Sequence, residues 1–262
     1  MLRSLYSGIS GMKNFQTKLD VIGNNIANVN TYGFKKGRTT FSDLISQTTS
    51  GATAPTGNQG GINAKQVGLG AQVASIDTLH TQGSMQTTGR VLDLAISGEG
   101  YFELQDASGA SFYTRTGNFY FDANRNIVNS SGLKLSIEGD AIIPADAQSF
   151  SIGTDGQISY VDATGALQQG GQIQMFTFQN PEGLDKAGGN TFQVSGNSGP
   201  ATQTFAGQDG AGSLNSGYLE MSNVDLSEEF TEMIVAQRGF QSNTKIITTS
   251  DEILQELVNL KR

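Results

Sequence analysis

Residues 226–262 read LSEEFTEMIVAQRGFQSNTKIITTSDEILQELVNLKR, and hydrophobic side chains recur along them at alternating spacings of four and three residues. This spacing is typical of a coiled-coil helix. The seam positions are Leu226, Phe230, Met233, Gln237, Phe240, Thr244, Ile247, Asp251, Leu254 and Val258. We expect one helix of about 33 residues, roughly 50 Å long at about 1.5 Å per residue.

The ends of this segment carry helix-terminating chemistry. Asp225 or Ser227 can cap the first turn, and Lys261 and Arg262 complement the dipole at the end. The polar residues Gln237, Thr244 and Asp251 sit at every second seam position through the middle of the helix. Such residues can fix the register or face a water-lined channel, or they are merely tolerated on the surface, and these interpretations remain open.

The N-terminal segment repeats the design. Its seam positions are Leu5, Ile9, Met12, Phe15, Leu19, Ile22, Ile26 and Val29. Asn28, Asn30 and Gly33 then supply cap and turn chemistry, so this helix is expected to end near residue 28.

Between the two helices the pattern changes to that of strands. Residues 67–219 contain short alternating runs such as VLDLAI at 91–96 and IQMFTF at 173–178. Turn signals such as Ser108–Gly109 and Asp155–Gly156 separate the runs. The sequence therefore predicts an all-β body.

These patterns predict a mixed α and β fold, in which an all-β central domain is flanked by terminal helices that pair as an antiparallel coiled coil. The expected inner domain is residues 1–35 plus 222–262, and the outer domain is residues 67–221. Residues 36–66 form a linker and extended arm, because the stretch 46–65 has no large apolar side chain except Ile62.

Charge supports the pairing of the two ends. Residues 1–38 hold six basic side chains and one acidic one, whereas residues 220–262 hold eight acidic and four basic. Two paired helices bury only one seam each, so their other apolar side chains are expected to contact further copies of the chain.

Composition excludes several classes. The net charge of −8 argues against nucleic-acid binding, which needs clustered cations. The absence of Cys removes disulfides and thiolate metal sites. The chain has no apolar run of about 18 residues, the length that membrane insertion requires. Its N-terminus lacks the pattern of a standard secretory signal.

Motifs of catalysis and cofactor binding do not emerge either. His80, the single histidine, lies in a strand-like run, which favours a structural or surface role. Residues 122–126 imitate the start of a calcium loop, but the required Gly and Glu are replaced by Ile127 and Leu133. We therefore expect no catalytic residue, no metal site and no cofactor.

Four stretches resemble the bacterial flagellar rod and hook protein family. They are NNIANVNTYGFK (24–35), GRVLDLAISGEGYFEL (89–104), YTRTGNFYFDANRNIVNSSG (113–132) and SNVDLSEEFTEMIVAQRGFQSNTKIITTSDEILQELVNLKR (222–262). The family signature falls on Asn24, Asn25, Asn28, Thr31, Gly33, Phe34 and Lys35. The resemblance spans nearly the whole chain.

The resemblance implies a structural role without enzymatic activity. Terminal helices of the family form an inner coiled-coil layer around a channel, so the apolar seam residues are expected to serve subunit assembly. The implied partners are copies of the same chain, other axial proteins of rod, hook–filament junction and cap, and the flagellar type III export apparatus. The implied location is the flagellum, in the hook or basal body, after export from the cytoplasm.

Export has a candidate element. Phe41 to Ile45 resembles the family's Phe-x-x-x-aliphatic motif, which would act on the unfolded chain at the export gate. The alternative is that Phe41, Leu44 and Ile45 form the apolar side of a short docking helix.

Within the family, the motifs LDVIGNNIAN, VGLG and MIVAQRGFQSN look most like hook proteins, so we interpret the chain as a short hook subunit that transmits motor torque. The alternative is a distal rod subunit, which the short chain and the arm at 46–65 favour. An alternative of another class, a secreted β-rich carbohydrate-binding or hydrolytic protein, would need an aromatic platform or a carboxylate pair, and the chain has no Trp.

Overall fold

The computed structural model describes residues 2–55, 57, 60–139, 143–144, 147–208 and 210–260. The chain forms two compact units. The helical unit comprises Met1–Ala27, Gly37–Thr78 and Asp225–Arg262, and the β unit comprises Asn28–Lys36 and Leu79–Val224.

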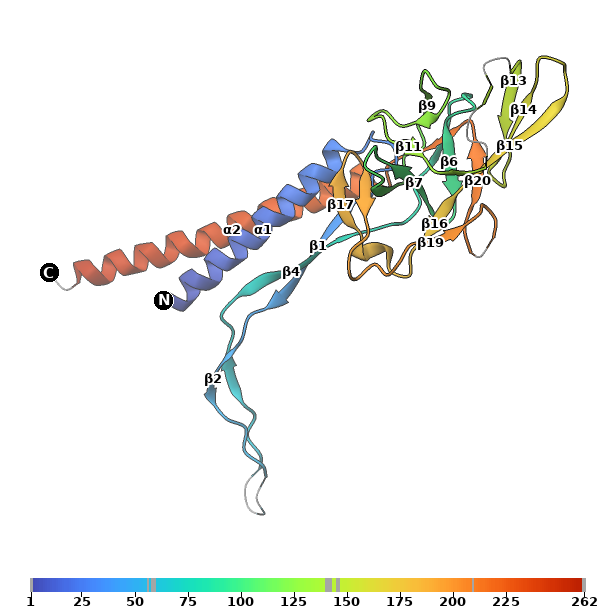
Figure 1. The fold of residues 1–262 in the computed structure, drawn as a ribbon. Helices are drawn as coiled ribbons and strands as arrows, with labels where there is room; N and C mark the ends of the chain where they lie inside the picture. The colour runs from blue at the N-terminus through green and yellow to red at the C-terminus, as the bar shows by residue number, and fades with distance from the viewer. Residues whose placement is uncertain are drawn as a thin grey trace. The chain divides into compact units, whose positions relative to one another are not determined.

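The helical unit contains two helices and a long hairpin. Its elements are α1 (Leu2–Ala27), β1 (Gly37–Asp43), β2 (Gln47–Ser50), β3 (Lys65–Val67), β4 (Ala71–Thr78) and α2 (Leu226–Asn259). The two helices run side by side (Figure 1). Asp225 caps α2, because its carboxylate accepts hydrogen bonds from the backbone N–H groups of Ser227 and Glu228.

The hairpin of the helical unit includes the segment expected as an extended arm. β1 and β4 pair antiparallel, with a bulge between Thr40 and Phe41, and β2 pairs antiparallel with β3 farther out. All the side chains of β2 and β3 are exposed. The arm is thus a two-stranded ribbon that presents both of its faces to solvent.

The β unit consists of short antiparallel strands. They are β5 (Met85–Thr87), β6 (Leu94–Ser97), β7 (Tyr101–Gln105), β8 (Ser111–Thr114), β9 (Tyr120–Phe121), β10 (Ile127–Val128), β11 (Lys134–Leu135), β12 (Ile137–Glu138), β13 (Ser149–Ile152), β14 (Gln157–Val161), β15 (Leu167–Ile173), β16 (Met175–Thr177), β17 (Asp185–Gly188), β18 (Thr191–Gln193), β19 (Thr202–Thr204), β20 (Ser213–Ser216) and β21 (Tyr218–Glu220), with a 3₁₀ turn at Pro181–Gly183.

Sheet order places most of these strands in two sheets. A nine-stranded sheet has the path β17-β18-β8-β7-β11-β10-β9, to which β16 and β19 are joined beside β7. A four-stranded sheet has the order β12-β15-β14-β13, and two further pairs are β20-β6 and β21-β5. In this path β17 is an edge strand.

The core of the β unit is built from the alternating runs of the sequence. Phe102 and Phe119 are fully buried and meet edge to face, with ring centroids 5.4 Å apart. Leu94, Leu104 and Ile173 are also completely buried in this cluster. A second cluster of aromatic side chains includes Tyr101, Tyr113, Phe176, Phe178 and Phe192.

Three sequence-based expectations meet the structure here. The strand-rich centre between two terminal helices is confirmed. The docking helix at residues 41–45 is wrong, because Phe41 lies in strand β1, which stays paired with β4 as far as Asp43. The expected domain bounds also differ from the observed units, because residues 28–36 and 222–224 belong to the β unit and residues 37–78 to the helical unit. Lys261 and Arg262, the expected dipole partners, lie outside the described residues.

Candidate functional site: a helix face and a buried charge cluster

The antiparallel register of α1 and α2 is fixed by polar contacts along the pair. Lys18 Nζ lies 2.5 Å from Glu232 Oε2, and Asn25 Nδ2 donates to Glu229 Oε2 at 3.1 Å. Near the other end, the hydroxyl of Thr244 approaches Met12 Sδ at 3.4 Å. Residue numbers rise along one helix as they fall along the other, so the helices are antiparallel.

Small residues let these two helices come close. A Cβ atom at Gly239 would lie 2.5 Å from Cζ of Phe15, and one at Gly8 would lie 3.2 Å from Cγ1 of Ile247. Ala236 is fully buried, and Ser250 is 7% exposed. A larger side chain at Gly239 would therefore have to displace the Phe15 ring.

The sequence-derived seam of α2 divides into two sets. Met233, Phe240, Ile247 and Leu254 are half-buried. Leu226, Phe230 and Val258 are 40%, 50% and 66% exposed. The positions of α2 that face α1 beside the first set are instead Glu229, Ala236, Asn243 and Ser250. The polar positions Gln237, Thr244 and Asp251 are exposed as well.

On α1 the outcome is similar. Ile22 is 4% exposed, whereas Ile9 is 38% exposed. Leu5, Met12, Leu19 and Ile26 are half-buried. On α2, further exposed apolar side chains are Ile234, Val235, Ile246, Ile253 and Leu257, and Leu260 at its C-cap is exposed as well. The helix pair thus retains apolar side chains that the described part of the chain does not cover.

Asn25, the buried signature residue of the helical unit, acts as a backbone clamp. Its amide donates to the carbonyl of Gly37 at 2.9 Å and accepts from the N–H of Gly37 at 2.9 Å. Because this pair of bonds imitates a strand partner, it fixes where β1 begins after α1. Asn24, its neighbour in the signature, is exposed.

In the β unit, two signature residues, Gly33 and Lys35, contact Glu220, whose carboxylate is buried. Lys35 Nζ lies 2.6 Å from Glu220 Oε1, and both side chains have zero exposure. Arg115 Nη1 lies 3.5 Å from Glu220 Oε2. The backbone N–H of Gly83 donates to Glu220 Oε1 at 2.9 Å, and that of Gly33 to the Glu220 carbonyl at 2.8 Å.

Burial governs the ionisation of this cluster. It lowers the pKa of Lys35, and the adjacent Glu220 carboxylate opposes that shift. Lys35 also donates to the carbonyl of Thr81 at 2.8 Å. Because both charges lack water, removing either one would leave the other poorly compensated.

Gly33 is required by its backbone and by its neighbours. Its φ is +65°, in the left-handed region. A Cβ atom there would lie 2.8 Å from the backbone nitrogen of Thr116. Thr31 closes the preceding turn, because its N–H and hydroxyl both donate to Asn28.

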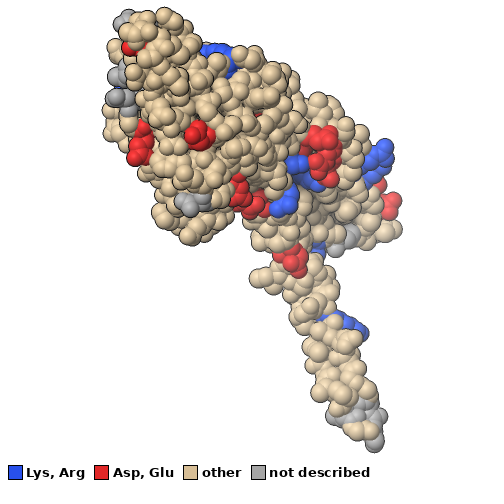
Figure 2. Space-filling view, turned by 90° about the vertical axis from the view of Figure 1, so that its right-hand side faces the viewer, with Lys and Arg blue, Asp and Glu red and all other residues tan. Residues whose placement is uncertain are grey.

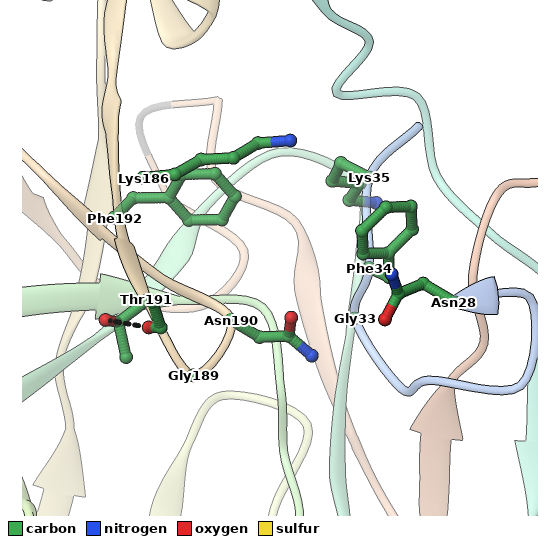
Figure 3. A pocket seen from close by; sticks show the side chains of 10 residues that line it. Asn28, Gly33, Phe34, Lys35, Lys186, Gly189, Asn190, Thr191 and Phe192 are labelled. Atoms are coloured by element: carbon green, nitrogen blue, oxygen red, sulfur yellow. Dashed lines mark hydrogen bonds between the residues drawn. The ribbon is translucent and has the colours of Figure 1, made fainter. Parts of the chain in front are cut away.

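A cavity of about 170 Å³ lies beside this turn. Figure 3 shows Phe34, Lys35 and Asn28 on one side of it and Lys186 and Phe192 on the other. Lys186 Nζ lies over the Phe34 ring, 5.5 Å from its centroid. Desolvation lowers the pKa of Lys186 even though the residue as a whole is exposed, because its ammonium group lies against the cavity wall.

His80 belongs to the aromatic cluster of the β unit. Its Nδ1 lies 2.7 Å from the Tyr101 hydroxyl, and its ring meets Phe192 with centroids 5.3 Å apart. Burial, together with the nearby Lys35, Arg115 and Lys186, lowers the pKa of His80 to about 4. The imidazole is therefore neutral at physiological pH and packs as part of the core.

Sequence analysis missed the partners of the signature. Glu220, Arg115, Lys186 and Asn223 were not singled out, although an acid inside the run YLEM at 218–221 is a signal that a buried cation is near. Asn223 accepts from the N–H of Lys36 at 2.8 Å and donates to the carbonyl of Leu79 at 2.9 Å. It thereby ties three separate segments of the β unit together.

Three family models match the chain. A "Flagella basal body rod protein" model matches residues 5–35, a "Flagellar hook protein FlgE/F/G D1 domain" model residues 95–160, and a "Flagellar basal body rod FlgEFG protein C-terminal" model residues 215–260.

Relatives match over full length. The chain is 63% identical to the flagellar basal-body rod protein FlgG of Bacillus subtilis (strain 168), with all of both chains covered. It is 40% identical to the flagellar basal-body rod protein FlgG of Borreliella burgdorferi and 32% identical, over 442 aligned residues, to the flagellar hook protein FlgE of the same organism, again with both chains fully covered.

This chain belongs to the flagellar rod and hook protein family. It is a structural protein of the flagellar axis and not an enzyme. The match places it in the flagellum, where proteins of this family assemble with one another in the rod and hook. Within the part of the chain that the structure describes, neither helix combines the length and the apolar character needed to cross a membrane.

Proposed function

We propose that this chain is a distal rod subunit of the flagellar basal body, which stacks with copies of itself into a hollow, straight tube. The observation that carries the proposal is its 63% identity, over all of both chains, to a protein named as a basal-body rod protein. The hook interpretation, which the sequence motifs favoured, has weaker support, because the hook relative at 32% identity aligns over 442 residues against 262 in this chain.

The helical unit supplies the assembly surface in this proposal. α1 and α2 cover one face of each other, and side chains such as Phe230, Ile234 and Val258 remain 50–66% exposed. A helix of 34 residues with this much uncovered apolar surface gains stability by packing against neighbours. Coiled-coil packing between neighbouring copies would cover these side chains.

Export through the type III apparatus belongs to the proposal as well. Phe41 is 41% exposed in β1 and its ring lies 6.3 Å from that of Phe15, while Ile45 is 86% exposed. Ile45 therefore contributes little to the folded core, which leaves its apolar side chain available for a role before folding.

Complementation tests the assignment. The chain is expressed in Bacillus subtilis lacking its FlgG and, separately, in the same species lacking its hook protein. We expect motility to return only in the strain without FlgG, with complete basal bodies by electron microscopy. Restoration of hooks in the second strain, with no rescue of the first, would favour the hook assignment.

A further inference from the structure

The cavity between Phe34 and Lys186 is lined by the ammonium group of Lys186, whose charge no described residue balances. Lys35, the other cation that lines it, is paired with Glu220 at 2.6 Å. Lys186 contacts the Phe34 ring, but no carboxylate among the described residues lies within ion-pair distance of its ammonium group. The cavity wall thus partly desolvates a positive charge without supplying a counter-charge.

The walls of the cavity are fixed, so it exists before any partner arrives. Phe34 is 9% exposed and Phe192 is 4% exposed. Asn190 donates from its side chain to the carbonyl of Tyr32 at 3.1 Å, which ties the turn after β17 to the signature turn. The Thr191 hydroxyl donates to the Gly188 carbonyl at 2.7 Å, as the dashed line in Figure 3 shows.

The mouth of the cavity is also open for approach. Gly188 and Gly189 have no atoms within 4 Å of where a Cβ would lie. All four residues of β17, the edge strand that carries Lys186, are exposed. A side chain from outside can therefore reach the ammonium group.

Charge complementarity indicates what that side chain carries. Residues 39–219 contain 15 acidic and six basic side chains, and Lys186 is one of the six. Of the other five, Arg115 is paired with Glu220 and Arg90 with Asp93. The face in view in Figure 2 carries Asp and Glu as well as Lys and Arg. Over residues 39–219 as a whole, a neighbouring copy in a polymer has more carboxylates than cations to offer this cavity.

We propose that the Phe34–Lys186 cavity is a docking site for a carboxylate side chain, Asp or Glu, of a neighbouring copy of this chain. The inference rests on the proposed function, since it requires the homopolymer. An ammonium–carboxylate bond held against two aromatic walls would offset the partial desolvation of Lys186, and it would fix the orientation of one β unit on the next.

The first test compares polymerisation of the purified full chain with that of Lys186→Gln, Lys186→Arg and Lys134→Gln. Lys134 is an exposed lysine of the same unit and serves as the matched control. We expect Lys186→Gln to raise the critical concentration about tenfold, the order of one charged hydrogen bond, while the other two variants stay within about twofold of the original chain. Unchanged thermal unfolding would show that the variants are folded.

The second test identifies the partner. Polymers made from a mixture of ¹⁵N-labelled and unlabelled chains are treated with a zero-length carbodiimide cross-linker and analysed by mass spectrometry. We expect Lys186 joined to Asp or Glu in mixed-label peptides, which only two different copies can produce. Same-label cross-links alone, or a normal critical concentration for Lys186→Gln, would overturn the docking site while leaving the rod assignment intact. Failure of the original chain to polymerise at all would overturn both.

Discussion

Glu220 stabilises the signature turn because its carboxylate and its carbonyl are both used. The carboxylate meets Lys35 at 2.6 Å and Arg115 at 3.5 Å, and the carbonyl accepts from Gly33. The charged side chains are almost completely excluded from solvent. Removing one member of such a buried ion pair is strongly destabilising, because the remaining charge is buried away from water without its partner.

Lys35→Met is expected to lower the free energy of unfolding of the β unit by about 3–5 kcal/mol. Urea unfolding followed by tyrosine fluorescence measures it, since six of the seven tyrosines lie in the β unit. The exposed control Lys134→Met should change stability by less than about 0.5 kcal/mol. A Lys35→Met protein as stable as the control would show that the ion pair does not hold the turn.

The lowered pKa of His80 makes the stability of the folded chain depend on pH. Its folded pKa of about 4 lies below the ordinary value of 6.5, so the unfolded chain takes up the proton first as the pH falls. The contribution of His80 to the free energy of unfolding is unchanged above pH 6.5 and decreases between pH 6.5 and 4, by at most about 3 kcal/mol. The difference in stability between the original chain and His80→Gln should shrink over that range, and a difference independent of pH would contradict the account.

Within the Glu220 cluster, some residues could be predicted from the sequence and others could not. Gly33 and Lys35 stand in a recognisable motif, and both are buried in the β unit. Glu220 and Arg115 have no such motif, because their importance comes from a contact between segments far apart in the chain. Sequence alone shows neither the distance between them nor the desolvation that makes the contact matter.

Among the elements, α2 was correctly predicted as a helix from its heptad pattern. The pattern identified only half of the residues that face α1. The positions Met233, Phe240, Ile247 and Leu254 share a face with Glu229, Ala236, Asn243 and Ser250. Hydrophobicity alone could not select this face, because Glu229 is charged, Asn243 and Ser250 are polar and Ala236 is small. Apolar residues also occupy the other faces of the helix. Close approach to the glycines of α1 makes the small and polar residues the better neighbours.

Phe240→Asp is expected to block polymerisation while leaving the β unit folded. It places a carboxylate on the half-buried side of α2, where an unpaired charge costs several kcal/mol. Sedimentation of polymers measures the effect, and circular dichroism of the strands checks folding. Gln241→Asp, at an exposed neighbouring position, is the control and should polymerise. Normal polymers from Phe240→Asp would mean that this side of α2 tolerates charge in the assembly.

In the whole molecule, the arm is the segment that we expect to make the tube stiff rather than flexible. It consists of β2, β3 and the segment that connects them, and the side chains of both strands are exposed. Lodged between neighbouring copies, such a ribbon would limit the axial sliding that bending requires. Sequence alone did not settle the choice between rod and hook, because both kinds of protein share the helical motifs.

Deleting residues 46–65 should leave the protein folded and make its tubes curved and compliant. The remaining hairpin can close, because the N–H of Leu44 already donates to the carbonyl of Gly70 at 2.9 Å. Curvature is measured on electron micrographs of the polymer. A Gly/Ser segment of equal length in place of 46–65 is the control for chain length and should behave like the deletion. Tubes that stay straight without the arm would remove it as the source of stiffness.

If this chain builds a rod, electron microscopy of the tubes formed by the purified, full-length protein will show it. We expect hollow tubes that are straight and rigid. Curved, supercoiled tubes from the original chain would contradict the rod assignment, and a protein that stays monomeric at high concentration would contradict the assembly itself.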